Sequence, residues 1–312
     1  MSAAALDVRA ITRRFGELIA VDRVSFRVEP GSICGFIGPN GAGKTTTMRI
    51  IATLDLPDAG DVYVDGHSVL EEPRLVRQRL GFMPDSYGAY QHTTVLDYLD
   101  FFARAYGLRG KERLETIRGV MDFTALEPLA KKEMGALSKG MKQRLCLAKT
   151  LLHDPAVLIL DEPAAGLDPR ARVELRELVR ALAEMGKAVL ISSHILSELG
   201  ELCEVVAVIE AGRVVANGSI QGILDGLRPH SQIYVRALTD QEVLERALAQ
   251  QPRVESVRPE RQGFALDFNG SEEEASELLA ELVRLGVRPV EFAASQVDLE
   301  DAFLSLTEGK VQ

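Results

Sequence analysis

A glycine-rich segment carries the clearest chemical signal in the sequence. Gly38, Gly43, Lys44 and Thr45 satisfy the pattern G-x-x-x-x-G-K-[ST], which cradles nucleotide phosphates. Glycine lets backbone N–H groups approach phosphate oxygens, and the N-terminus of a following helix attracts the same negative charge. We expect the lysine to bridge the β- and γ-phosphates and the threonine hydroxyl to bind Mg²⁺. The predicted nucleotide-binding residues are Gly38, Pro39, Asn40, Gly41, Ala42, Gly43, Lys44, Thr45 and Thr46.

Two adjacent carboxylates form a second candidate for chemistry. Asp161 and Glu162 directly follow the apolar run Val157–Leu160, which has the composition of a buried strand. Open α/β sheets bind ligands at the carboxyl ends of such strands. We expect Asp161 to hold Mg²⁺ through water and Glu162 to be the general base that polarises the attacking water. A solvated acidic turn is the alternative, and the phosphate loop upstream favours the catalytic interpretation.

A third motif, Leu137–Arg144, reads Leu-Ser-Lys-Gly-Met-Lys-Gln-Arg and resembles the signature of ABC-type ATPases. Phe15 matches the family's adenine-stacking aromatic, Ala165–Asp168 its D-loop, and His194 its switch histidine at the γ-phosphate. The resemblance covers about residues 5–225 and implies that the chain binds and hydrolyses ATP, with His194 in the catalytic set. Without it, ordinary packing and a structural hydrogen bond would be the simplest roles for Phe15 and His194.

The same resemblance implies that two copies of the chain pair head to tail. Ser138 and Gly140 of one copy would then contact the γ-phosphate bound by Lys44 of the other. A serine hydroxyl, a glycine N–H group and a helix N-terminus together form an end that binds anions. We therefore predict that a second copy completes each ATP site.

Asp85 departs from the family pattern, which usually has glutamine at this place. Glutamine offers an acceptor and a donor, whereas ionised aspartate only accepts and adds negative charge. We hypothesise that Asp85 contacts the Mg²⁺ shell, directly or through water; the alternative is that it points away from the site. Lys139 and Met141 replace the commoner Gly and Gln of the signature. Lys139 either places a positive charge near the partner's nucleotide or points to solvent.

The elements that must position these residues alternate between strands and helices. Residues 32–37 form an apolar strand that enters the glycine loop, and the apolar spacing of residues 44–53 predicts a helix after it. Apolar residues recur at threes and fours over about residues 94–150, which predicts a helical insert. We predict an α/β fold: a P-loop NTPase core with a mostly parallel sheet, an antiparallel β edge and this insert.

A change of pattern predicts two domains, a nucleotide-binding domain at 1–227 and a C-terminal domain at 228–312. From Arg228 onward the chain has 9 basic and 16 acidic side chains, and its elements follow the order β-α-β-β-α-β. This order predicts a small ferredoxin-like α+β domain, followed by a helix at Leu299–Leu306. The resemblance implies an accessory or regulatory role for this domain; an acidic surface that is merely solvated is the alternative.

Composition limits the partners and the compartment. The net charge of −10 argues against binding to nucleic acid, which requires a basic face. Cys34, Cys146 and Cys203 lie among apolar neighbours and predict buried free thiols in a reducing compartment, the cytoplasm. The apolar runs are too short to span a bilayer, and no secretory signal begins the sequence. We expect the chain to be peripheral to the inner face of the cell membrane, held there by a separate permease.

Two functional classes remain open. The segments Tyr87–Tyr90, Asp97–Phe102 and Val297–Leu304 resemble ATPases of bacterial ABC-2 type exporters, which implies ATP-driven efflux of a drug, lipid or polysaccharide. The helical insert would then dock on the permease. The alternative is a non-transport ABC ATPase in translation or DNA maintenance. Such chains typically carry two cassettes or a coiled coil, and the short, heptad-free stretch between Lys44 and Leu137 favours transport.

Overall fold

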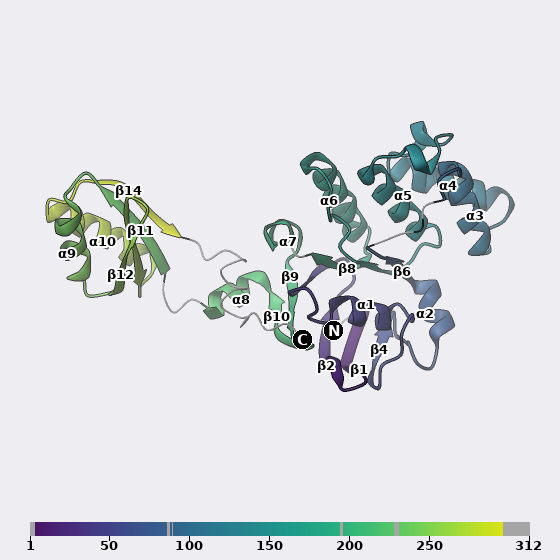
Figure 1. Cartoon of the computed structure of the whole chain (residues 1–312), viewed down its shortest axis with the longest axis horizontal. Coiled ribbons are helices and arrows are strands. Elements are labelled where there is room, and N and C mark those ends of the chain that lie inside the picture. Colours follow the sequence, from purple (N-terminus) through teal and green to yellow (C-terminus); the bar gives the residue numbers. More distant parts are fainter. Residues whose placement is uncertain (1–3, 86–87, 89, 194–195, 228–230, 296–312) are drawn as a thin grey trace. The chain divides into compact units, whose positions relative to one another are not determined.

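The computed structural model describes residues 4–85, 88, 90–193, 196–227 and 231–295. They form two compact units, divided between Ile220 and Gln221 (Figure 1). The helix expected at residues 299–306 lies outside the described residues.

A six-stranded, mostly parallel sheet forms the centre of the first unit. Four neighbouring pairs along it run parallel, and only the edge strand β10 is antiparallel to its neighbour β9. Strands β3 and β7 are buried along their whole length, as their continuous apolar sequences require. The strands lie in the order β10 (Arg213–Ser219), β9 (Val205–Glu210), β3 (Ile33–Ile37), β8 (Ala188–Ser193), β7 (Val157–Leu160) and β6 (Leu80–Met83).

The first unit also contains an antiparallel sheet, whose strands come before and after β3 in the sequence. Its buried side chains belong to the same hydrophobic core as those of β3 and the helix that follows it, and the rings of Phe26 and Phe36 lie 5.2 Å apart. The mixed α/β core predicted from the sequence is therefore confirmed. The strands of this sheet lie in the order β2 (Leu18–Val28), β1 (Leu6–Phe15), β4 (Ala59–Val64) and β5 (His67–Ser68).

The helices of the first unit connect these strands and form the predicted insert. The insert, α3 to α5, has its own core, in which Leu99, Ile117, Leu126 and Leu145 are buried together. The Thr94 hydroxyl caps its first helix by accepting from the N–H of Asp97. The helices are α1 (Lys44–Ile51), α2 (Pro73–Arg79), α3 (Val95–Ala105), α4 (Gly110–Phe123), α5 (Lys139–Leu151), α6 (Pro169–Glu184) and α7 (Leu196–Leu202), with 3₁₀ turns η1 (Glu127–Leu129) and η2 (Met134–Ala136). The division between the units falls after the first residue of α8 (Ile220–Leu227).

After α8, the second unit consists of a four-stranded antiparallel sheet with two helices and a separate core. Its elements follow the β-α-β-β-α-β order expected from the sequence, and its strands lie in the order β12-β13-β11-β14. A capping box between Ser271 and Glu274 starts its second helix. The elements are β11 (Ser231–Ala237), α9 (Gln241–Ala249), β12 (Val254–Glu260), β13 (Gly263–Phe268), α10 (Glu272–Arg284) and β14 (Pro289–Ser295).

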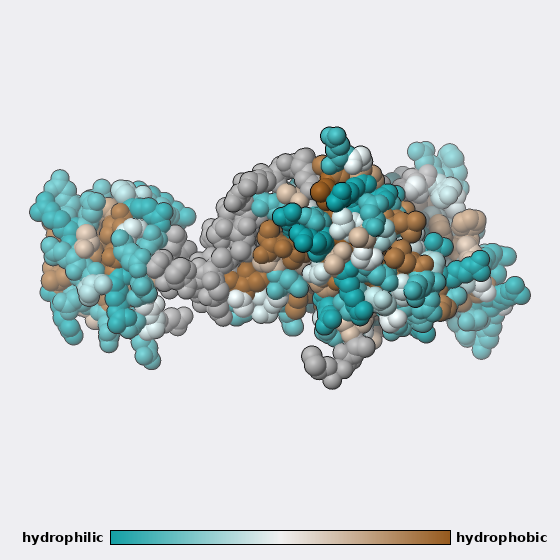
Figure 2. All heavy atoms as spheres, turned by 90° about the horizontal axis from the view of Figure 1, so that it is seen from below, coloured by the Kyte–Doolittle hydropathy of each residue, from teal (hydrophilic) through white to brown (hydrophobic). Residues whose placement is uncertain are grey.

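The polarity of the surface and the burial of the cysteines agree with what the composition predicts. On the face shown in Figure 2, hydrophilic side chains cover most of the second unit. Within the described ranges, no helix is long and apolar enough to cross a membrane. Cys34, Cys146 and Cys203 are free and buried, as predicted.

Candidate nucleotide site

The phosphate-binding loop lies between β3 and α1, and its packing explains two of its glycines. A Cβ atom on Gly38 would lie 2.3 Å from the carbonyl oxygen of Ile209. Gly43 has a φ of +103°, and its Cβ would lie 2.4 Å from the carbonyl oxygen of Ala20. Any side chain at these positions would collide with neighbouring backbone, so the packing of the loop requires glycine even without a bound phosphate.

Lys44 begins α1, and its side chain turns back into the loop. It is only 7% exposed, and its Nζ donates to the carbonyl oxygens of Gly38, at 2.6 Å, and Pro39, at 3.2 Å. Burial lowers the pKa of Lys44, and the nearby charges of Glu162 and Asp161 partly offset this effect. The ammonium group is thus held inside the loop by two backbone carbonyl oxygens.

Asp161 and Glu162 follow β7, and a buried serine from the neighbouring strand β8 joins them. The Oγ of Ser192 donates to Asp161 Oδ1 at 2.7 Å and accepts from the N–H of Glu162 at 2.8 Å. Glu162 has a φ of +48°, so its backbone is in the left-handed region that most residues avoid. The serine bridge therefore supports a sharp turn that presents two carboxylates at the end of the sheet.

Burial of Asp161 is the main cause of its raised pKa. Hydrogen bonds from Ser192 and Thr45 lower the pKa, whereas the charges of Asp85 and Glu162 raise it. Thr45 and Asp161, the two residues predicted to hold Mg²⁺, are therefore in direct contact across the loop. Hydroxyl and carboxylate oxygens are suitable Mg²⁺ ligands. No group of three or more His, Cys, Asp or Glu side chains in the described ranges could hold a metal ion.

A cavity of about 720 Å³ lies in front of the loop. Its volume is in the range of small-molecule sites. Phe15, 48% exposed, lies at its wall, with the guanidinium carbon of Arg13 4.8 Å from the ring centroid. The lining residues are Phe15, Leu18, Ala20, Asn40, Gly41, Gly43, Lys44, Thr45, Thr46, Asp85, Lys139, Glu162 and Ala165.

Asp85 is exposed and lines this cavity together with Lys44 and Glu162. It follows β6, the strand beside β7, so two neighbouring strands deliver carboxylates to one edge of the sheet. This placement argues against the alternative in which Asp85 points away from the site.

The signature residues Ser138 and Gly140 start α5 and are not among the residues that line the cavity of their own chain. Ser138 caps the helix, since its Oγ accepts from the N–H of Met141 at 3.3 Å. A Cβ on Gly140 would lie 2.9 Å from the Cβ of Ala171 on α6. Lys139, between these residues, does line the cavity. His194 lies outside the described residues.

The sequence-based prediction did not include Ser192, although a signal for it exists. Ser192 and Ser193 end an otherwise apolar buried strand, and both are buried. A polar side chain at such a position needs a partner, and the carboxyl end of a parallel strand faces the ligand edge of the sheet.

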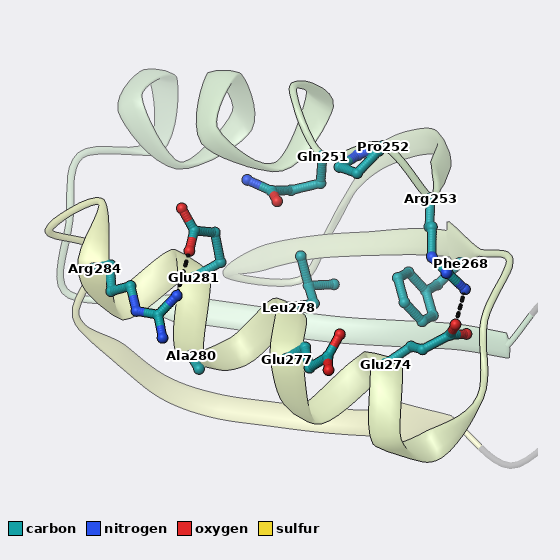
Figure 3. A pocket seen from close by; sticks show the side chains of 10 residues that line it. All are labelled: Gln251, Pro252, Arg253, Phe268, Glu274, Glu277, Leu278, Ala280, Glu281 and Arg284. Carbon is teal, nitrogen blue, oxygen red and sulfur yellow. Dashed lines mark hydrogen bonds and ion pairs between the residues drawn. The ribbon is translucent and has the colours of Figure 1, made fainter.

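The second unit contains another cavity, of about 380 Å³, between α10 and the segment after α9 (Figure 3). Phe268 and Leu278 contribute apolar surface to it. Ion pairs from Arg253 to Glu274 and from Arg284 to Glu281 flank it, as Figure 3 shows. These basic side chains are already paired with carboxylates, unlike Lys44 in the loop of the first unit, whose ammonium group donates to backbone carbonyl oxygens.

Comparison with known proteins identifies the family. A family model described as ABC transporter matches residues 21–165. The chain is 40% identical over 225 residues to "Nod factor export ATP-binding protein I" of Burkholderia pseudomallei (strain 1710b). It is 38% identical over 225 residues to the protein of the same name in Rhizobium sp. (strain N33). Each match covers 72% of this chain and 74% of the relative. The chain belongs to the ABC transporter ATP-binding proteins.

Solved structures agree with this assignment. One described as "Structure of ATP binding subunit of ABC transporter" has a TM-score of 0.65 and 30% identity, covering 72% of this chain and 93% of the other. A nucleotide-free ATP-binding cassette from an ABC transporter has a TM-score of 0.65 at 24% identity, which supports the fold alone. The chain is thus an ABC-type ATPase, the ATP-binding subunit of a transporter.

Proposed function

We propose that this chain hydrolyses ATP to drive a separate membrane permease of an ABC exporter. The proposal rests mainly on one observation: the carboxyl ends of three neighbouring strands bring Lys44, Asp161 and Ser192 together. Lys44 follows β3, Asp161 follows β7, and Ser192 lies on β8. The relatives named for Nod factor export support export as the direction. A drug, lipid or polysaccharide is the cargo class that we propose.

The proposed chemistry follows from the donors and acceptors at this edge of the sheet. Lys44 donates to β- and γ-phosphate oxygens in place of the loop carbonyls that it now contacts. Thr45 and Asp161 would hold Mg²⁺, which neutralises phosphate charge when bound. Glu162 accepts a proton from the water that attacks the γ-phosphate, and its backbone N–H, bonded to Ser192, fixes the turn that aims it.

The remaining site residues complete this proposal. Phe15 stacks on the adenine, supported by its exposure at the cavity wall. Asp85 binds the water shell of Mg²⁺, and His194 contacts the γ-phosphate. Ser138 and Gly140 act on the nucleotide of a second copy, since they do not line their own cavity.

The assembly that we propose is a head-to-tail dimer on the inner, cytoplasmic face of the membrane. The insert α3 to α5 docks on the permease, and the second unit acts as an accessory or regulatory domain. The separate core of that unit supports treating it as a domain. We place the domain boundary at the end of α8, which gives residues 1–227 and 228–312, whereas the two compact units divide at its start.

Substitution of the general base tests the chemistry. Glu162→Gln should bind ATP with nearly unchanged affinity and hydrolyse it about 10²- to 10⁴-fold more slowly. Glu177→Gln, on the exposed surface of α6, is the matched control and should hydrolyse ATP at the wild-type rate. Undiminished turnover by Glu162→Gln would place the base elsewhere.

Isolation of the tagged chain from its native membrane tests the transport role. A polytopic membrane protein that accompanies the chain, and whose presence raises its ATPase rate, is the expected result. Recovery with ribosomes or DNA in its place would support the non-transport alternative and overturn the proposal.

A further inference from the structure

Arg13 lies over the aromatic ring that is proposed to bind the adenine, and two carboxylates hold it there. Its guanidinium carbon is 4.8 Å from the centroid of the Phe15 ring. Its Nη2 lies 2.9 Å from Asp55 Oδ1, and its Nη1 donates to Asp58 Oδ1 at 3.2 Å. The Arg13 side chain is only 22% exposed, so these contacts give the guanidinium group one defined position over the ring.

Both carboxylates come from the segment that follows α1, and this segment also fastens the end of β1. The N–H of Asp58 donates to the carbonyl oxygen of Thr12 at 2.7 Å. Asp58 Oδ2 accepts from the N–H of Arg14 at 2.6 Å. Asp58 thus contacts the three consecutive residues directly before Phe15. The backbone that carries the aromatic ring is therefore fixed by contacts within the protein.

The stack on Arg13 leaves the other side of the ring for a base. Phe15 lines the nucleotide cavity, whereas Arg13 is not among the residues that line it, so the guanidinium group and the cavity adjoin different parts of the ring. A planar guanidinium group is attracted to an aromatic face, which helps to orient the ring. A ring that is already oriented loses less conformational entropy when a ligand stacks on it, and the ligand binds more tightly.

We propose that Arg13 is a positioning residue for the base of the nucleotide. Held by Asp55 and Asp58, it supports the Phe15 ring on one side, and the adenine stacks on the side that faces the cavity. Arg13 acts through the ring and does not touch the nucleotide, so it contributes to binding of the base and not to binding of the phosphates. The inference rests on the proposed function, because it requires adenine to stack on Phe15.

Ligands with and without a base test this role on the full-length chain. Calorimetry measures the affinities of the wild type and Arg13→Ala for ADP, for the non-hydrolysable analogue AMP-PNP and for tripolyphosphate, which has phosphates but no base. We expect Arg13→Ala to bind both nucleotides about two- to fivefold more weakly, the range of one exposed cation–π contact. Its affinity for tripolyphosphate should equal that of the wild type. Arg13→Lys keeps the charge but loses the planar group, so its nucleotide affinity should lie between those of Arg13→Ala and the wild type.

Arg9, on the same strand, provides the matched control. Its guanidinium carbon lies 4.1 Å from the centroid of the Tyr63 ring, and its Nη2 lies 2.8 Å from Asp7 Oδ2. Neither Arg9 nor Tyr63 is among the residues that line the nucleotide cavity, so Arg9→Ala should bind all three ligands as the wild type does. Arg13→Ala combined with Phe15→Ala should bind nucleotides no more weakly than Phe15→Ala alone, because Arg13 acts only through the ring.

The possible outcomes separate this inference from the proposed function. Equal losses of affinity for tripolyphosphate and AMP-PNP in Arg13→Ala would show a disturbed phosphate loop and refute the positioning role. Unchanged nucleotide binding by Arg13→Ala, together with weakened binding by Phe15→Ala, would also refute it while the proposed function stands. If the wild type binds neither nucleotide, the proposed function itself fails.

Discussion

Replacement of Ser192 by alanine should disturb both stability and the catalytic turn. The Ser192 side chain is completely buried and makes two contacts, donating to Asp161 Oδ1 at 2.7 Å and accepting from the N–H of Glu162 at 2.8 Å. Alanine removes both contacts, so Asp161 Oδ1 and the Glu162 N–H each lose this partner. The variant thus tests whether this serine holds the carboxylates in place.

The expected magnitude follows from these two bonds. A hydrogen bond to a charged group contributes about 1.5–3 kcal/mol, and a neutral one about 1 kcal/mol. Because the two contacts share one oxygen and are not additive, we expect the free energy of unfolding to fall by about 2–4 kcal/mol. For a domain of about 200 residues, this corresponds to a decrease in Tm of about 5–15 °C.

The loss should also depend on pH. Burial holds the pKa of Asp161 above its ordinary value of 3.8, so the folded state binds this proton more tightly than the unfolded state. The resulting stabilisation is present below pH 3.8 and is lost as pH rises through the raised pKa. The hydrogen bond from Ser192 lowers that pKa, so removing the hydroxyl raises the pKa of Asp161 further. The pH range over which this stabilisation is lost then extends to higher pH in the variant. The difference in unfolding free energy between wild type and variant should therefore be larger at pH 8 than at pH 4.

Urea denaturation of the wild type and Ser192→Ala at both pH values measures the effect. Ser32→Ala is the control, since the Ser32 hydroxyl donates to the carbonyl oxygen of Glu29 at an exposed turn and should contribute under about 1 kcal/mol. A loss in Ser192→Ala no larger than that of the control, or a loss equal at pH 4 and pH 8, would refute the reasoning.

Three further predictions concern the nucleotide site. Phe15→Ala should weaken ATP binding about tenfold through lost stacking, measured by calorimetry, while Phe101→Ala at an exposed position of α3 should not. Lys44→Met should weaken ATP binding at least tenfold. Burial lowers the pKa of Lys44 below its ordinary value of 10.5, so the free energy of unfolding of the wild type, measured by denaturation, should rise relative to that of this variant as pH increases from the lowered pKa to 10.5. A difference in unfolding free energy that stays constant with pH would contradict the lowered pKa. Asp85→Ala should require several-fold more Mg²⁺ for half-maximal ATP turnover, and Asp85→Gln should lie between it and the wild type; equal Mg²⁺ dependence in all three proteins would exclude a role for Asp85 at the metal.

The sequence predicted the fold class because its evidence is local. Continuous apolar runs such as Val157–Leu160 are typical of buried parallel strands, and the structure confirms a mostly parallel sheet. The order of elements beyond Arg228 was equally readable, because helices and strands differ in the period of their apolar residues. The roles of the site residues stay predictions, and His194 and the helix at residues 299–306 lie outside the described residues.

The phosphate loop is a feature that the sequence alone determines, whereas the contact of Ser192 with Asp161 and Glu162 depends on the tertiary structure. Gly38, Gly43, Lys44 and Thr45 are contiguous, so the sequence by itself determined that this segment is a phosphate loop. Ser192 lies 31 positions from Asp161, and only the parallel pairing of β7 with β8 brings their side chains to 2.7 Å. The same holds for Arg13 and Asp58, because no periodicity within one element records which segments of a folded chain come into contact.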